Sequence, residues 1–156
     1  MAVSDYVSRT IDVLAFRGGV ASTEVLLGQS LADTVSGGEI TTGIQKLAQR
    51  WLITLLTELG TVKYKPTMGT TFMTQLRQGY IRSDADMRAL FALSELRVRE
   101  QLNNEVTATT PLDEQYRDAS LTGVTVIPGY VNISVTFRSR AADGTSTFIV
   151  PIPLVV

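Results

Sequence analysis

The stretch VNISVTF, residues 131–137, alternates apolar and polar side chains. Alternation with a period of two predicts a β-strand that has one face on a core. Val124 and Val126 predict an earlier strand, and the step from Pro128 to Gly129 predicts the turn between the two strands. The last third of the chain therefore predicts antiparallel strands joined by short turns.

The chain continues from this strand to an uncharged segment. Asp143 and Gly144 predict a second turn, and FIVPIPLVV, residues 148–156, has no charged side chain. An apolar strand at a sheet edge can pair with another chain, although Pro151 and Pro153 each remove a backbone donor. Two alternatives stay open: a last strand packed in the protein's own core, or a strand that a partner completes. The candidate edge consists of Thr147, Phe148, Ile149, Val150, Pro151 and Ile152.

Two main helices are predicted before these strands. Apolar side chains recur every three or four positions within residues 44–59, which predicts a helix with one apolar stripe. Thr42 and Gln45 predict a capping box at its start, and Gly60 predicts its end. A short helical piece is expected within residues 71–78, where Gly79 would close it.

The second long helix is predicted over residues 84–104, with Ser83 and Asp86 as its capping pair. One apolar stripe of this helix suits a core, and a second stripe lies on the opposite side. The second stripe consists of Ala89, Ala92, Leu93 and Leu96. A helix that is apolar on two sides is either enclosed by its own domain or contacts a partner, and both alternatives stay open.

The order of these elements predicts an α+β fold, in which two main helices pack on a small, mostly antiparallel sheet. Residues 1–40 are rich in turn signals, and their apolar pieces at 11–16 and 25–27 predict short strands or an arm. We therefore expect an N-terminal arm over residues 1–40 and an α+β domain over residues 41–156. A length of 156 residues suits one domain of this kind.

The composition excludes several classes of function. With 14 basic and 15 acidic residues the net charge is -1, so no nucleic-acid partner is expected. The chain has no cysteine and no histidine, which removes thiolate nucleophiles, imidazole bases and most transition-metal sites. We therefore expect no metal and no cofactor. We also expect no membrane partner, because no apolar run approaches the ~20 residues of a membrane span. A soluble protein made in the cytoplasm is expected.

The segment LLTELGTVKYKPTMGTTF, residues 55–72, raises the question of a phosphate-binding loop, a catalytic corner or a structural turn. It lacks the lysine followed by serine or threonine that a Walker-type phosphate loop requires. Lys63 and Lys65 flank Tyr64, which predicts a surface strand with both ammonium groups on one face. The residues expected to fix the bends of a structural corner are Gly60, Pro66 and Gly69.

Carboxylates are the remaining candidates for catalysis, because glycoside hydrolysis needs two acids and no histidine. Glu58 lies beside the corner and is the main candidate, although the sequence fixes no partner acid for it. Glu95 and Arg99 are expected to form an ordinary surface pair on one helix. Most other acids are expected to be solvated surface residues.

The order of these signals resembles the sheath-initiator family of contractile bacteriophage tails, which are baseplate wedge proteins also labelled lysozyme-like. The resemblance covers residues 44–153. It rests on IQKLAQRWLITLLTELG at 44–60, KPTMGTTF at 65–72, the long helix that follows, and GYVNISVTFRSRAADGTSTFIVPI at 129–152. The family commonly has an acid after the glycine that ends its first helix, where this chain has Thr61. That departure weakens any carboxylate chemistry taken over from the family label.

The resemblance implies a structural role in the tail baseplate of a virion assembled in the host cytoplasm. The implied partners are the tail sheath protein, which would attach by strand exchange at the candidate edge, the baseplate wedge proteins, and the tail tube as a further candidate. Candidate contacts with wedge proteins or neighbours are Lys63, Tyr64, Lys65, Ala89, Leu93 and Leu96. Truncation after Ser146 is expected to spare the helices and to abolish sheath attachment.

A non-enzymatic assembly protein is therefore the leading hypothesis. The alternative is an acid-active muramidase with Glu58 as its catalytic acid. A regulatory binding module is a third hypothesis, because one fold can host unrelated functions.

Overall fold

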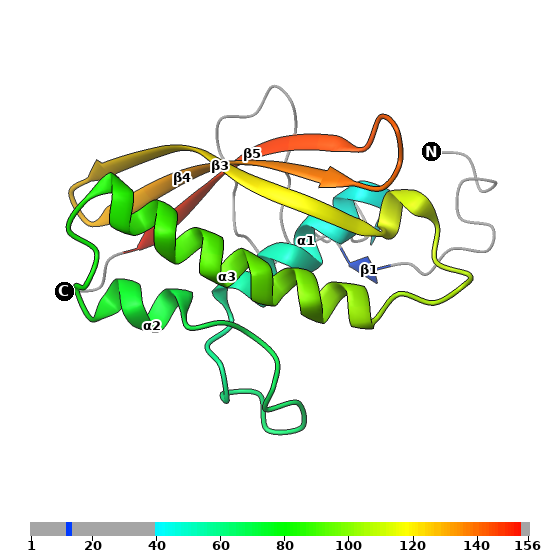
Figure 1. Ribbon diagram of the computed structural model, residues 1–156, viewed down its shortest axis with the longest axis horizontal. Helices are drawn as coiled ribbons and strands as arrows, with labels where there is room; N and C mark the ends of the chain where they lie inside the picture. The colour runs from blue at the N-terminus through cyan, green and yellow to red at the C-terminus, as the bar shows by residue number, and fades with distance from the viewer. Residues whose placement is uncertain (1–11, 14–39, 154–156) are drawn as a thin grey trace, which may run out of the picture.

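The computed structural model describes residues 12–13 and 40–153. In these residues two long helices lie on one face of a three-stranded antiparallel sheet, as Figure 1 shows. The elements in chain order are β1 (Asp12–Val13), β2 (Ile40–Thr41), α1 (Gly43–Leu56), α2 (Phe72–Arg77), α3 (Asp84–Asn104), the 3₁₀ helix η2 (Leu112–Glu114), β3 (Tyr116–Ile127), β4 (Tyr130–Ser139) and β5 (Thr145–Pro153). The predicted α+β class is confirmed.

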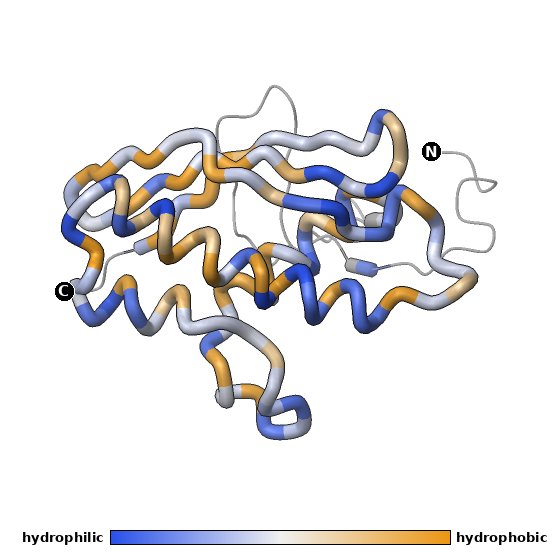
Figure 2. The backbone as a smooth tube through the Cα atoms, viewed as in Figure 1, coloured by the Kyte–Doolittle hydropathy of each residue, from blue (hydrophilic) through white to orange (hydrophobic). Residues whose placement is uncertain are grey.

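The sheet has the order β3-β4-β5, with β4 in the centre. Along β4 every second side chain is buried, as the alternation in the sequence predicts, and Figure 2 shows the same alternation as changing hydropathy. The buried side chains of β4 are those of Val131, Ile133, Val135, Phe137 and Ser139. β3 is much longer than the two valines predicted, because it already begins at Tyr116.

Trp51 of α1 joins the helices to the sheet. Its ring is fully buried, and its centroid lies 6.0 Å from that of Phe91 on α3. On the sheet side, the Trp51 centroid lies 6.0 Å from Phe137 and 5.9 Å from Phe148. Since burial of a large apolar side chain contributes about 1.5–3 kcal/mol, this cluster holds both layers together.

The start of α1 differs from the predicted capping box. The Thr42 side chain makes no capping bond and instead donates from Oγ1 to Glu114 Oε1 over 3.1 Å. The same Glu114 oxygen accepts the backbone N–H of Gly43 at 3.1 Å. A carboxylate that is distant in sequence therefore satisfies a free donor at the helix start, in place of a local partner.

The end of α1 also differs from the prediction. The helix ends at Leu56, before Gly60, because Thr57 adopts an extended backbone. The Thr57 carbonyl accepts the N–H of Thr70 at 2.9 Å, and the N–H of Leu59 donates to the Thr70 carbonyl at 2.9 Å. This bonding to a returning segment replaces the last predicted helical turn.

α3 agrees with the sequence at both ends. Ser83 Oγ accepts the backbone N–H of Asp86 at 3.1 Å, as the capping pair predicts. A separate hydrogen bond between the Ser83 side chain and the Asp86 carboxylate, together with one that the Arg82 backbone N–H donates to Asp86 Oδ2, lowers the pKa of Asp86. The shorter helix α2 ends before Gly79, whose φ of +69° closes it.

The arm predicted for residues 1–40 is described only in part. Asp12 pairs with Thr41 and Val13 with Ile40, so a two-residue strand lies beside the start of the domain. Asp12 Oδ2 accepts a hydrogen bond from Gln49 Nε2 at 3.2 Å. The strand expected at residues 25–27 falls outside the described residues.

Candidate protein-interaction surfaces

β5 forms one edge of the sheet, and within residues 12–13 and 40–153 no strand pairs with its outer side. Phe148, Val150 and Ile152 of the candidate edge are buried in the core, whereas Thr147 is exposed. The two alternatives from the sequence therefore do not exclude each other. One face of β5 belongs to the core, and its outer backbone pairs with none of the described strands.

The hydrogen bonds of the β4–β5 turn set the direction of every backbone group on β5. Ser139 N donates to the Gly144 carbonyl at 2.7 Å, so the backbone groups of Gly144 point toward β4. Because backbone direction alternates along a strand, every second residue of β5 after Gly144 also directs its backbone groups toward β4. The residues that direct their backbone groups away from β4 are Thr145, Thr147, Ile149, Pro151 and Pro153. Both prolines therefore remove donors from the outer edge and none from the ladder.

The outer N–H groups of β5 are confined to one short section. Thr145 N already donates to the Asp143 carbonyl within the turn, at 2.9 Å. Among the described residues, nothing accepts from the outward N–H groups of Thr147 and Ile149, which an incoming strand could bind. Pro151, the next outward residue, has no N–H. Pairing at this edge is therefore limited in length and fixed in position.

β3 forms the other edge and has a different character. Its pairing with β4 shifts register between Tyr116 and Asp118 and again between Leu121 and Gly123. The Leu121 carbonyl points away from β4 and accepts a hydrogen bond from Arg88 Nη1 of α3, at 3.2 Å. α3 therefore runs beside this edge.

The second apolar stripe of α3 is exposed. Leu93 is 67% exposed and Leu96 is 57% exposed, and Ala89 and Ala92 are exposed as well. A pocket of about 370 Å³ lies between this side of α3 and β3, with Leu96 and Leu121 among the residues that line it. Within the described residues, no part of the chain encloses the stripe.

The predicted surface strand at Lys63, Tyr64 and Lys65 is wrong. These residues form turns, closed by a hydrogen bond from Lys65 N to the Val62 carbonyl at 3.1 Å. The Lys65 ammonium pairs with Glu105, whereas the Lys63 ammonium lies 5.6 Å from the centroid of the Tyr64 ring. The two lysines therefore have separate contacts inside the protein, although Tyr64 is 90% exposed.

The corner itself is built by glycines, as predicted. Gly69 has a φ of +97°, and a Cβ atom there would lie 2.4 Å from the Thr57 carbonyl oxygen, so only glycine fits. Gln101 of α3 binds both the N–H and the carbonyl of Gly69, at 3.0 and 2.9 Å. Gly60 also has a positive φ, of +85°, and Pro66 lies in a turn.

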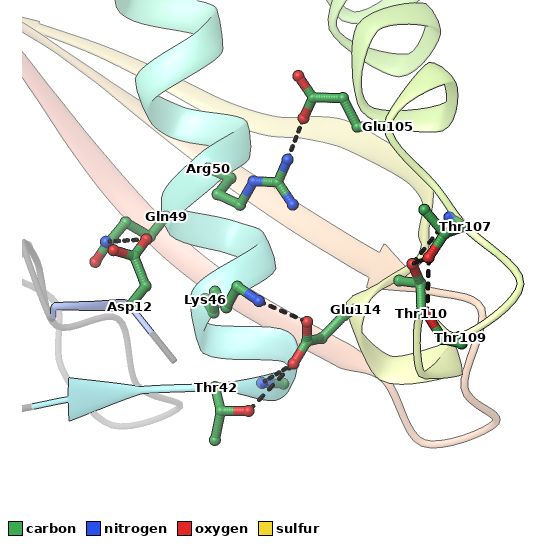
Figure 3. A network of polar contacts seen from close by, with 11 residues as sticks. Asp12, Thr42, Lys46, Gln49, Arg50, Glu105, Thr107, Thr109, Thr110 and Glu114 are labelled. Atoms are coloured by element: carbon green, nitrogen blue, oxygen red, sulfur yellow. Dashed lines mark hydrogen bonds and ion pairs between the residues drawn. The ribbon is translucent and has the colours of Figure 1, made fainter. Parts of the chain in front are cut away.

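Figure 3 shows a polar cluster that fixes α1 against η2. Lys46 Nζ lies 2.7 Å from Glu114 Oε2, and both side chains are almost completely buried. Arg50 pairs with Glu105 nearby, and a pocket of about 240 Å³ lies beside these residues. The cations at this pocket already have carboxylate partners, so its charges do not call for an anionic ligand.

The candidate catalytic acid Glu58 has a structural partner. Its Oε1 atom pairs with Arg77 of α2, and its backbone forms an isolated parallel bridge with Thr70. Within the described residues, no group of three or more acidic side chains is arranged to hold a metal ion. The muramidase role of Glu58 stays a prediction from the sequence.

Glu95 is buried, which corrects its expected place on the surface. Its Oε1 atom accepts hydrogen bonds from Tyr116 Oη at 2.7 Å and from the predicted partner Arg99 at 2.9 Å. Burial and, secondly, the hydrogen bond to Glu95 raise the pKa of Tyr116. The sequence alone does not indicate this contact, because Tyr116 lies outside the strand that Val124 and Val126 predict.

The comparisons with known proteins do not identify the chain. Neither models of protein families, nor curated proteins, nor solved structures gave a match. None of the helices in the described residues is long and apolar enough to span a membrane. The resemblance to sheath initiators therefore remains a prediction from the motifs of this chain.

Proposed function

We propose that this protein is a structural assembly protein that binds a strand from a neighbouring subunit at the outer edge of β5. On the sequence resemblance, the assembly is the baseplate of a contractile phage tail and the neighbour is the first ring of sheath subunits. The observation that carries the proposal is the outer backbone of β5, which has no partner strand in the described residues.

β5 suits this role because its buried side chains anchor it in the core, whereas its outer backbone edge can bind a partner. Phe148, Val150 and Ile152 are held in the core, so the strand is fixed before any partner arrives. The outward residues carry no charge, and Pro151 ends the section that can donate hydrogen bonds. A fixed strand with a limited pairing section can set the register of the strand it receives.

The exposed stripe of α3 supplies a second contact, which we assign to a wedge protein. Leu93 and Leu96 are more than half exposed, and exposed apolar patches commonly mark contact sites. The stripe lies on the side of α3 that faces away from the core residues Leu90 and Val98. A protein that binds one partner at the outer edge of β5 and another at the exposed stripe of α3 connects two components of an assembly.

A cryo-EM map of the particle that carries this chain tests the location. We expect the chain at the base of the sheath, with an additional strand beside β5. A position remote from both sheath and wedge would contradict the proposal.

Sheath nucleation in vitro tests the mechanism. Thr147→Pro removes one outward N–H, so we expect a large loss of sheath assembly on the variant. Thr147→Val is the matched control, because it keeps the N–H and a β-branched side chain of similar size. Equal sheath assembly by the wild type and the proline variant would show that β5 does not pair with the sheath.

A further inference from the structure

The groove between α3 and β3 combines a side-chain pocket with a strand edge that no other described strand pairs with. The Leu121 carbonyl points out of the sheet toward α3, as its hydrogen bond with Arg88 shows. Because backbone direction alternates along a strand, Ala119 directs its N–H and carbonyl to the same side. A backbone donor and an acceptor therefore border the groove.

The walls of the groove are mainly apolar. Phe91, Ala92 and Leu96 of α3 face Ala119 and Leu121 of β3 across a volume of about 370 Å³. This volume lies near the lower end of the ~300–1,000 Å³ of small-molecule pockets. It suits one or two apolar side chains.

The floor of the groove has one fixed acceptor. The Glu95 side chain is only 7% exposed, and it lines the pocket. Tyr116 and Arg99 both donate to Oε1, and no hydrogen bond from the described residues reaches Oε2. This oxygen can accept a hydrogen bond from a bound segment.

We propose that this groove binds an extended segment of a partner protein. The segment pairs with the backbone of Ala119 and places one apolar side chain between α3 and β3. The groove shares Ala92 and Leu96 with the stripe of α3 that we assign to a wedge protein, so this inference rests on that part of the proposed function and specifies its form. It concerns the edge opposite to the proposed sheath contact and does not depend on that contact.

The unpaired backbone decides between an extended segment and a helix. A helix packed on Leu93 and Leu96 would cover the groove and leave the backbone groups of Ala119 without partners. Each buried group without a partner costs about 1–3 kcal/mol. An extended segment satisfies these groups and uses the same apolar walls, which is the mode of β-strand addition beside a helix. A second copy of this chain that docks through its own α3 fails for the same reason.

The test uses the full chain and a library of random seven-residue peptides. We expect enrichment of peptides that have an apolar residue flanked by residues of high β-propensity, with binding measured by calorimetry on synthetic copies. Peptide binding should also slow hydrogen exchange at the Ala119 amide.

Two variants locate the binding, and one serves as control. Ala92→Trp fills the groove from an exposed position, and Ala119→Pro removes the outward N–H. Each should weaken binding at least tenfold. Val126→Pro removes an outward N–H of the same strand beyond the groove and should leave binding unchanged. Thermal unfolding verifies that each variant is folded, and Ala92→Trp decides the outcome if a proline disrupts β3.

Three results would overturn the proposal. The first is a library without enrichment over an unrelated protein, and the second is peptide binding that Ala92→Trp leaves intact. The third is a wild-type dimer that Ala92→Trp dissociates, because the groove would then be an interface between copies. Loss of sheath nucleation in Thr147→Pro has no bearing on these results, so the two proposals can fail separately.

Discussion

The two edges of the sheet differ in how they present their backbone. β5 pairs with β4 in one unbroken register, whereas β3 shifts register twice. On β5 the outer edge has two prolines and no charged side chain. β3 has the charged residues Arg117 and Asp118 near its start and lies beside α3, whose Arg88 binds the Leu121 carbonyl.

This difference indicates two ways to present a strand edge. A regular edge without a neighbouring helix can receive a strand through backbone bonds alone, and Pro151 limits that pairing. An irregular edge beside a helix gains a side-chain pocket, which can select among partners. The same sheet can therefore offer a register-setting contact and a sequence-selective contact.

The largest expected effect of a single substitution concerns the inner face of β5. Phe148→Ala should lower the free energy of unfolding by about 3–5 kcal/mol, because Phe148 is buried against Trp51. Thr147→Ala, on the exposed side, should cost less than about 1 kcal/mol. Urea denaturation measures both, and equal losses would show that the two faces of β5 are not distinct.

Truncation after Ser146 follows the same reasoning. It removes Phe148, Val150 and Ile152, all of which are buried. We therefore expect the truncated chain to lose its tertiary structure, which revises the expectation from the sequence that the helices would stay folded. Near-UV circular dichroism of the truncated chain, compared with the full chain, measures this.

The next effect tests the direction of the backbone groups on β5. Ser146→Pro removes a donor from the ladder with β4 and should cost about 1–3 kcal/mol. Thr147→Pro removes an outward donor and should cost less than about 1 kcal/mol. The free energies of unfolding come from urea denaturation. A larger loss for Thr147→Pro than for Ser146→Pro would mean that Thr147 donates to β4 and Ser146 faces outward.

A smaller effect depends on pH and concerns the start of β3. Burial raises the pKa of Tyr116, so the folded protein keeps a proton that the unfolded chain loses above about pH 10. Stability should therefore fall as the pH rises above about 10, by up to about 1.4 kcal/mol per pH unit from this group. Tyr116→Phe should have a shallower slope in the free energy of unfolding. Parallel slopes for the two proteins would contradict the assignment.

Arg88→Ala should have a slighter effect on stability. Arg88 is about half exposed, and it binds both Asp84 and the Leu121 carbonyl. Exposed pairs of this kind contribute at most about 1 kcal/mol. Urea denaturation should show a loss below that value, and a larger loss would mean that β3 depends on α3 for its stability.

Glu58→Gln should alter neither sheath assembly nor cell-wall release, since Glu58 lies at neither edge of the sheet and pairs with Arg77. Release of cell-wall fragments by the purified wild type and the variant measures this. Release by the wild type that the variant lacks would support the muramidase alternative.

The sequence determined the elements whose signals are local. The period of two in residues 131–137 predicted β4, and the capping pair of Ser83 and Asp86 placed the start of α3. Helical spacing alone also indicated a second apolar stripe at Leu93 and Leu96, but only the structure decided that this stripe is exposed. Such patterns succeed because burial of one face imposes its period on the chain.

Only the tertiary structure decided the contacts between distant segments. Glu114 replaces the expected cap of α1, Thr70 ends that helix early, and Tyr116 takes Glu95 out of solvent. Each of these contacts joins residues that no local spacing relates. The sequence could therefore indicate which polar groups need hydrogen-bond partners. The packing of α1, α3 and the sheet decided which partners they have, because a buried polar group must bond to a group that packing brings within reach.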